Sequence, residues 1–248
     1  MPSPTRRVPS LRRLEQSTVK AVRTRLLRWG RANQRRYPWR DQQATPYEVA
    51  IAEVLLRRTT ATAAARLFPA FVSEFPDWAA LDKASEKRIA KRLQPVGLSR
   101  QRARDLRRLA HMVVRDYGGT LPTALPELLK LPGLGPYSAR AVLSFAQGRR
   151  AAAVDSNVSR VLGRLFWPSL KQAPPTKLQA TADSLVAPRS HRSFNFALLD
   201  LSASVCRYDR PRCEKCPLRG NCRYFQQTSR KAAANGGTGR RVPLCHDA

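Results

Sequence analysis

The chain has 248 residues, of which 42% are hydrophobic and 25% charged, and these values are typical of one large globular domain or two small ones. Its 46 Lys and Arg against 17 Asp and Glu give a net charge of +29, which favours a polyanionic partner, most commonly nucleic acid. An anionic membrane surface is the alternative, but no run of 18 apolar residues could span a bilayer, and the basic start MPSPTRRVPSLRRLEQ lacks the apolar region of a signal peptide.

The first 40 residues hold twelve of the basic side chains and a single acid, Glu15. Residues 1–11 are small and basic, so we expect a disordered tail there. The five cysteines are an odd number in a chain without an export signal, which argues against a disulfide framework. We therefore expect a cytoplasmic, nucleoid-associated protein.

Most of the chain has a helical pattern. Apolar residues recur at three- and four-residue spacing over 48–75, 84–97, 100–119 and 138–148. Pro and Gly separate these segments, and alternating strand patterns are nearly absent, so the predicted fold class is all-α. Segments 92–106 and 130–143 both read as a helix, a short Gly turn and a helix, although such pairs also arise by chance in helical bundles.

The stretch LPGLGPYSARAV (131–142) predicts a tight turn that opens a helix. Backbone N–H groups at such a turn bind phosphate oxygens, and glycines let a nucleic-acid backbone approach closely. A plain connection between two helices is the simpler interpretation of this stretch alone.

Three other residues, Asp155, Glu53 and Tyr137, also have simple structural explanations. Asp155 precedes a helical segment and is a good helix N-cap. Glu53 has Arg57 four residues later, a spacing typical of a surface ion pair, but it lies in the apolar run IAEVLL. Tyr137 fits an ordinary core position.

Four of the cysteines lie within CRYDRPRCEKCPLRGNC (206–222), at spacings of six, two and five intervening residues. Four thiols this close in a reducing compartment are explained best as metal ligands: Cys206, Cys213, Cys216 and Cys222. Structural zinc sites usually have two paired-cysteine knuckles, whereas here one pair is flanked by single cysteines. An iron–sulfur cluster is therefore favoured over zinc.

The segments LPGLGPYSARAVLSFAQG and VDSNVSRVLGRLF together resemble the helix-hairpin-helix and Gly/Pro–Asp motif of the DNA glycosylases related to endonuclease III and MutY. The cysteine spacing is similar to that of the family's 4Fe–4S loop. The resemblance runs from about residue 20 to 226. It implies a two-domain fold with a 4Fe–4S cluster: a six-helix domain over 46–152, and a helical cluster domain built from 12–45 and 153–228. A disordered tail over 229–248 would follow and would include Cys245.

Position 137 indicates the type of reaction. Endonuclease III has a lysine at this place, which forms a Schiff base and drives strand cleavage, and a phenol cannot do so. The resemblance therefore implies a monofunctional glycosylase of base excision repair without lyase activity. Glu, Tyr and Asp are combined in two branches of the family, the MutY-type adenine glycosylases and the archaeal-type thymine/uracil–G mismatch glycosylases.

The surrounding sequence favours the mismatch branch, because LLRRTTA, GLSRQRARDL, RDYGGTLP and PRCEKC resemble it closely. MutY more typically has glutamines where Arg57 and Arg58 stand. MutY-type enzymes also generally add a C-terminal domain that senses 8-oxoguanine, and only 26 residues follow Cys222. We expect a monomer that removes thymine or uracil opposite guanine from mismatched double-stranded DNA; removal of adenine from A·G or A·8-oxoguanine pairs is the alternative.

The resemblance also implies roles for single residues, around a cleft that takes an extruded nucleotide. Asp155 would stabilise the oxocarbenium-like sugar and orient the attacking water. Glu53 would hydrogen-bond or protonate the departing base, and Tyr137 would pack near the base or sugar. The implied DNA contacts are Leu131, Gly133, Leu134 and Gly135 of the hairpin, together with Arg58 and Ser99.

Other classes of protein explain fewer of these features. A DNA-binding module accounts for the turn and the charge, but not for Glu53, Asp155 and the cysteines together. A metal-dependent nuclease needs clustered acids or histidines, and the three histidines are scattered along the chain. An electron-transfer protein accounts for the cysteines only.

Overall fold

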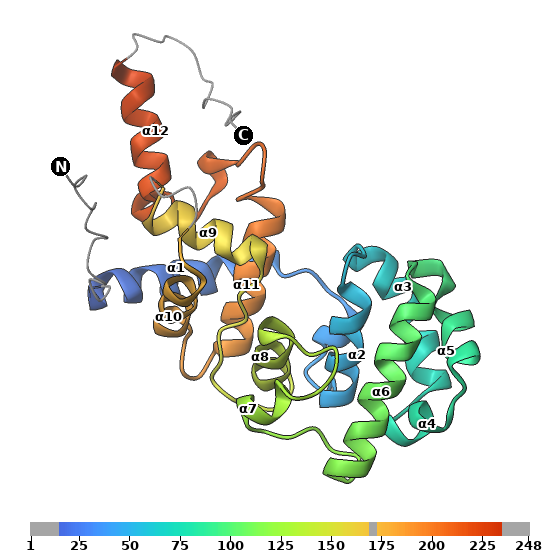
Figure 1. Ribbon diagram of the computed structural model, residues 1–248. Coiled ribbons are helices and arrows are strands. Elements are labelled where there is room, and N and C mark those ends of the chain that lie inside the picture. Colours follow the sequence, from blue (N-terminus) through green and yellow to red (C-terminus); the bar gives the residue numbers. More distant parts are fainter. Residues whose placement is uncertain (1–14, 169–172, 235–248) are drawn as a thin grey trace, which may run out of the picture. The chain divides into compact units, whose positions relative to one another are not determined.

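The computed structural model describes residues 15–168 and 173–234. Within these ranges the chain forms α-helices and short 3-10 turns and no strand, so the all-α prediction is confirmed (Figure 1). No helix in the described ranges is both long and apolar enough to cross a membrane. The predicted tail at 1–11, most of the one at 229–248, and Cys245 lie outside the described residues.

The α-helices follow one another with short connections. Their bounds are α1 Gln16–Asn33, α2 Pro46–Leu56, α3 Ala61–Glu74, α4 Trp78–Lys83, α5 Glu86–Leu93, α6 Ser99–Tyr117, α7 Leu125–Leu128, α8 Pro136–Phe145, α9 Ser156–Phe166, α10 Pro175–Leu185, α11 His191–Ser204 and α12 Arg223–Ala234. The 3-10 turns are η1 Pro38–Arg40, η2 Gln94–Val96, η3 Cys213–Lys215 and η4 Arg219–Asn221. Helix α12 thus extends six residues into the predicted tail at 229–248.

The described chain divides into two compact units. Unit 1 holds the residues up to Asn33, Val154–Ala187 and those from Phe196 on, and unit 2 holds Gln34–Ala153 and Pro188–Asn195. Helix α11 contributes to both. Residues 46–152 contain six helices of six or more residues and the four-residue α7. The domain bounds given above stay a prediction.

Helix α2 is the centre of unit 2, and eight of its eleven residues are buried. Thr45 and Glu48 form a capping box at its start, and Pro46 occupies the first helical position, so the beginning of the helix is fixed by local chemistry. Helices α3, α6 and α8 pack against α2, and α4 and α5 pack against α6 (Figure 1).

The single helical pattern expected over 48–75 is interrupted in the structure. Helix α2 ends at Leu56 and α3 begins at Ala61, because Arg58 takes the left-handed conformation with φ 54° and the Thr60 side chain caps α3. An apolar period does not reveal this break, since apolar residues recur at helical spacing on both sides of it. The break places Arg57 and Arg58 in a loop rather than on a helix face.

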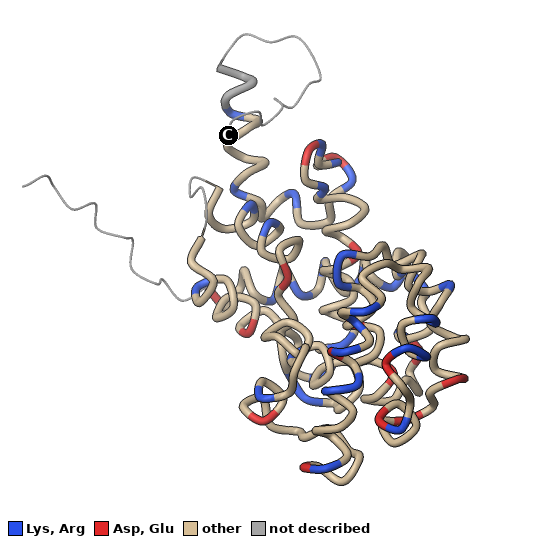
Figure 2. The backbone as a smooth tube through the Cα atoms, turned by 45° about the vertical axis from the view of Figure 1, so that its right-hand side comes forward, with Lys and Arg blue, Asp and Glu red and all other residues tan. Residues whose placement is uncertain are grey.

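In unit 1, α9 packs against α10 and α12, and α1 packs against α10. Gly30 of α1 lies so close to α11 that a Cβ at this position would come within 2.6 Å of the Ala197 Cβ. Arg23 of α1 donates to the carbonyls of Leu185 and Ser184, both at 2.8 Å, and so satisfies the end of α10. Figure 2 shows Lys and Arg distributed over helices of both units.

Candidate functional site

The turn between α7 and α8 is a tight hairpin. Leu131 and Leu134 are buried, and the Leu134 N–H donates to the Leu131 carbonyl at 3.2 Å, which closes the turn. Gly133 has φ 83°, a conformation that other residues adopt only with strain. Gly135 is exposed and has an ordinary φ of −82°, and an added Cβ would meet nothing within 4 Å. No contact within the described protein therefore explains the glycine at 135.

This hairpin has the features of an anion site. Helix α8 starts at Pro136 directly after the exposed Gly135, so its first N–H groups have no partners within the helix. A Cβ built at Gly133 would lie 4.0 Å from the Arg57 guanidinium, so a cation stands beside the turn. Open backbone donors and a helix dipole suit a phosphate group, while the Arg57 guanidinium beside the turn is already ion-paired with Asp105.

Glu53 and Tyr137 lie on the two helices that pack against each other beside this hairpin, α2 and α8. Glu53 is 5% exposed, which does not fit the surface ion pair considered from its spacing. Arg57 instead donates to Asp105 of α6 at 3.0 Å. Tyr137 is half-buried at the first turn of α8, so it is not an ordinary core residue.

A buried arginine joins the loop that carries Arg58 to the loop before α6. Arg102 is 2% exposed and donates to Val96 O at 2.6 Å and Gly97 O at 2.8 Å. It also donates to Thr59 Oγ1 at 2.6 Å and to the Arg57 carbonyl. The two loops are thereby held side by side.

Each of these loops contains a non-glycine residue in the left-handed conformation, Arg58 with φ 54° and Leu98 with φ 50°. Both side chains are exposed, Leu98 to 53%, and Ser99 follows at the start of α6. Strained backbone of this kind persists only where its surroundings enforce it. The hydrogen bonds of Arg102 to both loops hold the backbone in this conformation. They also bring the loops of Arg58 and Ser99 together within unit 2.

Asp155 lies in unit 1 and is the N-cap of α9, as its position predicted, accepting a hydrogen bond from the Val158 N–H at 2.7 Å. Its other carboxylate oxygen accepts from Asn157 Nδ2 at 3.2 Å. Arg160 donates to Asn157 Oδ1 at 2.8 Å and to the Cys206 carbonyl at 3.1 Å. A continuous chain of hydrogen bonds therefore runs from Asp155 to the first cysteine.

The four cysteines come together around one cavity of unit 1, although they belong to a loop and two 3-10 turns. The remaining lining is mostly apolar, with Val161 and Leu165 from α9 and Leu201 from α11. Arg164 of α9 contacts Cys206 Sγ at 3.6 Å and donates to the Arg207 and Tyr208 carbonyls at 2.6 and 2.7 Å. Helix α9 thus holds the cysteine loop through two arginines.

The positions of the four thiols bear on which metal ion or cluster they could hold. No three His, Cys, Asp or Glu side chains of the described residues are grouped closely enough for one metal ion. Four thiols nevertheless line the common cavity, and thiolates are ligands of both zinc and iron–sulfur groups. Burial raises the pKa of Cys213 to about 11 and of Cys216 to about 12, so metal binding would have to displace their protons.

Sequence reasoning missed several residues that support these sites. Arg102 and Arg160 donate hydrogen bonds to segments far away in the sequence, and nothing in their local sequence indicates those partners. Asn157 joins Asp155 to Arg160 at the start of α9. Asn195, 2% exposed, bonds the Ala153 N–H at 3.1 Å and so holds the segment that leads to Asp155. Its polar side chain within the apolar run FNFALL was the one available signal.

Comparison with known proteins identifies the family. Residues 51–188 match the model of the HhH-GPD superfamily base excision DNA repair proteins. The chain belongs to this superfamily. It is 38% identical over 210 residues to a thymine/uracil-DNA glycosylase of Methanothermobacter thermautotrophicus, and the aligned region covers 84% of this chain and 94% of that protein. It is 34% identical over 199 residues to an adenine DNA glycosylase of Mycobacterium tuberculosis, covering 79% of this chain and 65% of that protein.

Solved structures agree with this assignment. A thermostable thymine-DNA glycosylase superposes with a TM-score of 0.81 at 36% identity, over 85% of this chain and 98% of that one. An endonuclease III trapped covalently on DNA superposes with a TM-score of 0.75 at 22% identity, over 87% and 99%, which shows a shared fold. The resemblance stated from the sequence motifs is confirmed.

Proposed function

We propose that the chain is a monofunctional DNA glycosylase that removes thymine or uracil opposite guanine from mismatched double-stranded DNA. The observation that carries the proposal is the similarity to thymine/uracil-DNA glycosylases over nearly their whole length, combined with Glu53, Tyr137 and Asp155 at the positions that match the family motif. The enzyme would act as a monomer on DNA in the cytoplasm.

The proposed reaction begins with extrusion of the mismatched nucleotide, which costs least where base pairing is already poor. Hairpin N–H groups would hold a backbone phosphate, and Arg58 would border the space that the nucleotide leaves. We propose that Glu53, Tyr137 and Asp155 act on this one nucleotide. Gly135 supports the hairpin's role, because an external backbone is the partner that would need its open surface.

Breaking the base–sugar bond leaves positive charge on the sugar and an electron pair on the departing base. The Asp155 carboxylate would stabilise the oxocarbenium-like sugar and orient the water that adds to C1′. Glu53, held in an apolar environment, would hydrogen-bond or protonate the base. Tyr137 would pack against the base or sugar, and its phenol cannot form the Schiff base that strand cleavage requires.

We also propose that the four cysteines hold a 4Fe–4S cluster. Cys206, Cys213, Cys216 and Cys222 line one cavity, and Arg164 stands beside it to offset the negative charge of such a group. The cluster would fix the fold of the loop 206–222. Because Arg160 links this loop to Asn157 and Asp155, the loop would also help to position Asp155.

Removal of adenine is the second candidate, favoured by the 34% identity to an adenine DNA glycosylase. The proposal is tested on a duplex with a single T·G pair at excess enzyme, followed by chromatography of free bases and electrophoresis of the strand. We expect free thymine, and a nick only after hot alkali. A nick without alkali, or no thymine release, would contradict it.

A further inference from the structure

A groove lies on unit 2 between α5 and the first turns of α6. It has a volume of about 720 Å³. Its lining includes Lys87 and Lys91 of α5, Arg100 and Arg104 of α6, and Glu86 and Ser99 at the starts of the two helices. Apart from Ser99, none of these residues has a role in the reaction proposed above.

The four cations form two short rows. Lys87 and Lys91 are four residues apart on α5, as are Arg100 and Arg104 on α6, so each pair is separated by about 6 Å along its helix axis. This distance is on the scale of the spacing between successive phosphates of one DNA strand. All four side chains are exposed, and none has an ion-pair partner among the residues that the structure describes.

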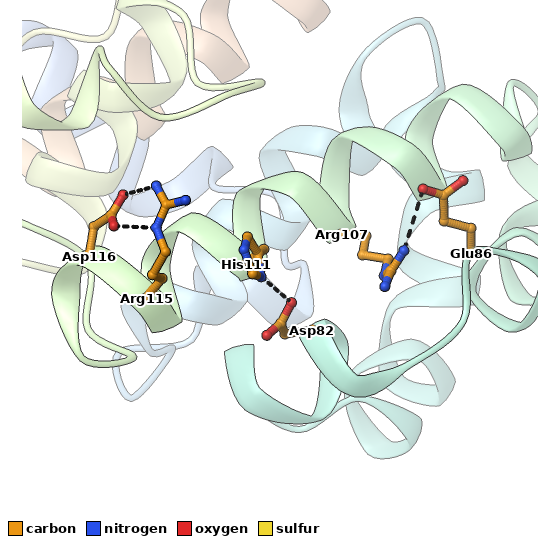
Figure 3. Close-up of polar contacts among 6 residues, drawn as sticks. All are labelled: Asp82, Glu86, Arg107, His111, Arg115 and Asp116. Carbon is orange, nitrogen blue, oxygen red and sulfur yellow. Dashed lines mark hydrogen bonds and ion pairs between the residues drawn. The ribbon is translucent and has the colours of Figure 1, made fainter.

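Several other cations on the same two helices are paired, whereas Arg108 of α6 has no ion pair among the described residues. Figure 3 shows Arg107 with Glu86 at 3.8 Å, His111 with Asp82 at 3.2 Å, and Arg115 with Asp116 at 2.5 Å. On another face of α5, Arg88 and Arg92 both bond to Glu74. The single acid in the groove lining, Glu86, forms its ion pair with Arg107, which lies outside the lining, and none with the four groove cations.

The groove adjoins the loops that carry the proposed DNA contacts. Ser99 is part of its lining, and Leu98 precedes it with an exposed side chain. Arg102 bonds this loop to the loop of Arg58. Moreover, the turn before α6 contains Gly97 with φ 71°, as the hairpin before α8 contains Gly133 with φ 83°. The two turns therefore share a glycine with positive φ, but they differ at the next residue, since Leu98 also has a positive φ and Leu134 does not.

We propose that the groove binds the sugar–phosphate backbone of duplex DNA beyond the extruded nucleotide, and that it extends the contact made by Arg58 and Ser99. A concave surface lined by one sign of charge strengthens the local field, and each Lys or Arg that neutralises a phosphate releases condensed cations. The inference rests on double-stranded DNA being the partner, and it is independent of which base is removed.

The test is the salt dependence of binding to an undamaged duplex of about 30 base pairs, compared between wild type and K87Q/K91Q/R100Q/R104Q. Each phosphate contact contributes a slope of about 0.9 in log Kd against log salt. Between 50 and 200 mM salt, four contacts amount to about 150-fold in Kd. In the fourfold variant we expect most of this 150-fold dependence of Kd on salt to disappear. K87Q/K91Q removes two of the four contacts, so its salt slope should fall by about half as much.

A control removes charge from three paired positions outside the groove, in R88Q/R92Q/R115Q, and the slopes of the two variants are compared per charge removed. We expect its salt slope to stay within about one contact of wild type, with thermal unfolding measured for both variants. The single-turnover rate of base release at saturating enzyme should be unchanged in the groove variant. Equal loss of slope in groove and control variants, or no loss in a folded groove variant, would overturn the inference. If the wild type releases no base, only the proposed function is refuted, because duplex binding is measured separately.

Discussion

Asp155 has a structural role and a proposed catalytic role, and the substitution Asp155→Asn separates them. As the N-cap of α9 it accepts a hydrogen bond from the Val158 N–H at 2.7 Å, which an asparagine oxygen can also accept. The bond from Asn157 Nδ2 at 3.2 Å to the other carboxylate oxygen is lost, because an amide NH2 is a donor. The free energy of unfolding should therefore change by less than about 1 kcal/mol, or about 2–4 °C in Tm. The negative charge is lost, however, and with it the stabilisation of the oxocarbenium-like sugar.

Loss of such a preorganised electrostatic contact lowers rates by about 10²–10³-fold, or about 3–4 kcal/mol in the barrier. Single-turnover base release from a T·G duplex measures this rate, and a binding titration with the same duplex should give a Kd within a few-fold of wild type. Asp77 is the matched control, because it caps α4 through a bond of the same length to Ala80 N–H. Asp77→Asn should change neither rate nor Tm. A rate for Asp155→Asn within tenfold of wild type would refute the proposed role.

Four further predictions follow from the site and its supports. Gly135→Ala should keep the free energy of unfolding within about 1 kcal/mol and weaken duplex binding about tenfold or more, whereas Gly133→Ala should lower Tm because of its φ of 83°. Unchanged duplex binding by Gly135→Ala would argue against the hairpin contact. Arg102→Met removes a buried cation that bonds four loop acceptors, so Tm should fall by about 5–10 °C, from about 2–4 kcal/mol; an unchanged Tm would show that the loops do not depend on it. Cys216→Ala should lose iron, measured by metal analysis, together with the visible absorption of a cluster, while full iron content would contradict the ligand assignment. Burial lowers the pKa of His191 below 6.5, so as the pH falls the unfolded chain takes up this proton before the folded chain does. The free energy of unfolding should therefore be constant above pH 6.5 and decrease below it. His191→Gln should reduce this pH dependence of the free energy of unfolding, measured by denaturant titrations.

The sequence predicted the fold class and the local chemistry well, because both depend on residues close together in the chain. The apolar period located α6 and α8 to within three residues of their observed bounds. Asp155 was recognisable as an N-cap and the Gly-x-Gly turn as a hairpin for the same reason. The four cysteines could be grouped because they lie within seventeen residues.

The supporting network could not be predicted, since it depends on contacts between distant segments. Arg102 reads as one more cation of a basic amphipathic helix, yet it is buried and bonds a loop 45 residues away. Likewise, Glu53 and Arg57 have the spacing of an ion pair, but the loop after Leu56 directs Arg57 to Asp105. Only the packing of α2 against α6 determines that partner.

The most direct test of the central claim is the substrate choice of the wild-type enzyme. Single-turnover base release would be measured on four duplexes of the same flanking sequence, with T·G, U·G, A·G or A·8-oxoguanine at the centre. The account predicts release from T·G and U·G at rates at least 100-fold above those for the two adenine pairs. Faster release of adenine would contradict it, and would make Glu53 the residue that acts on adenine.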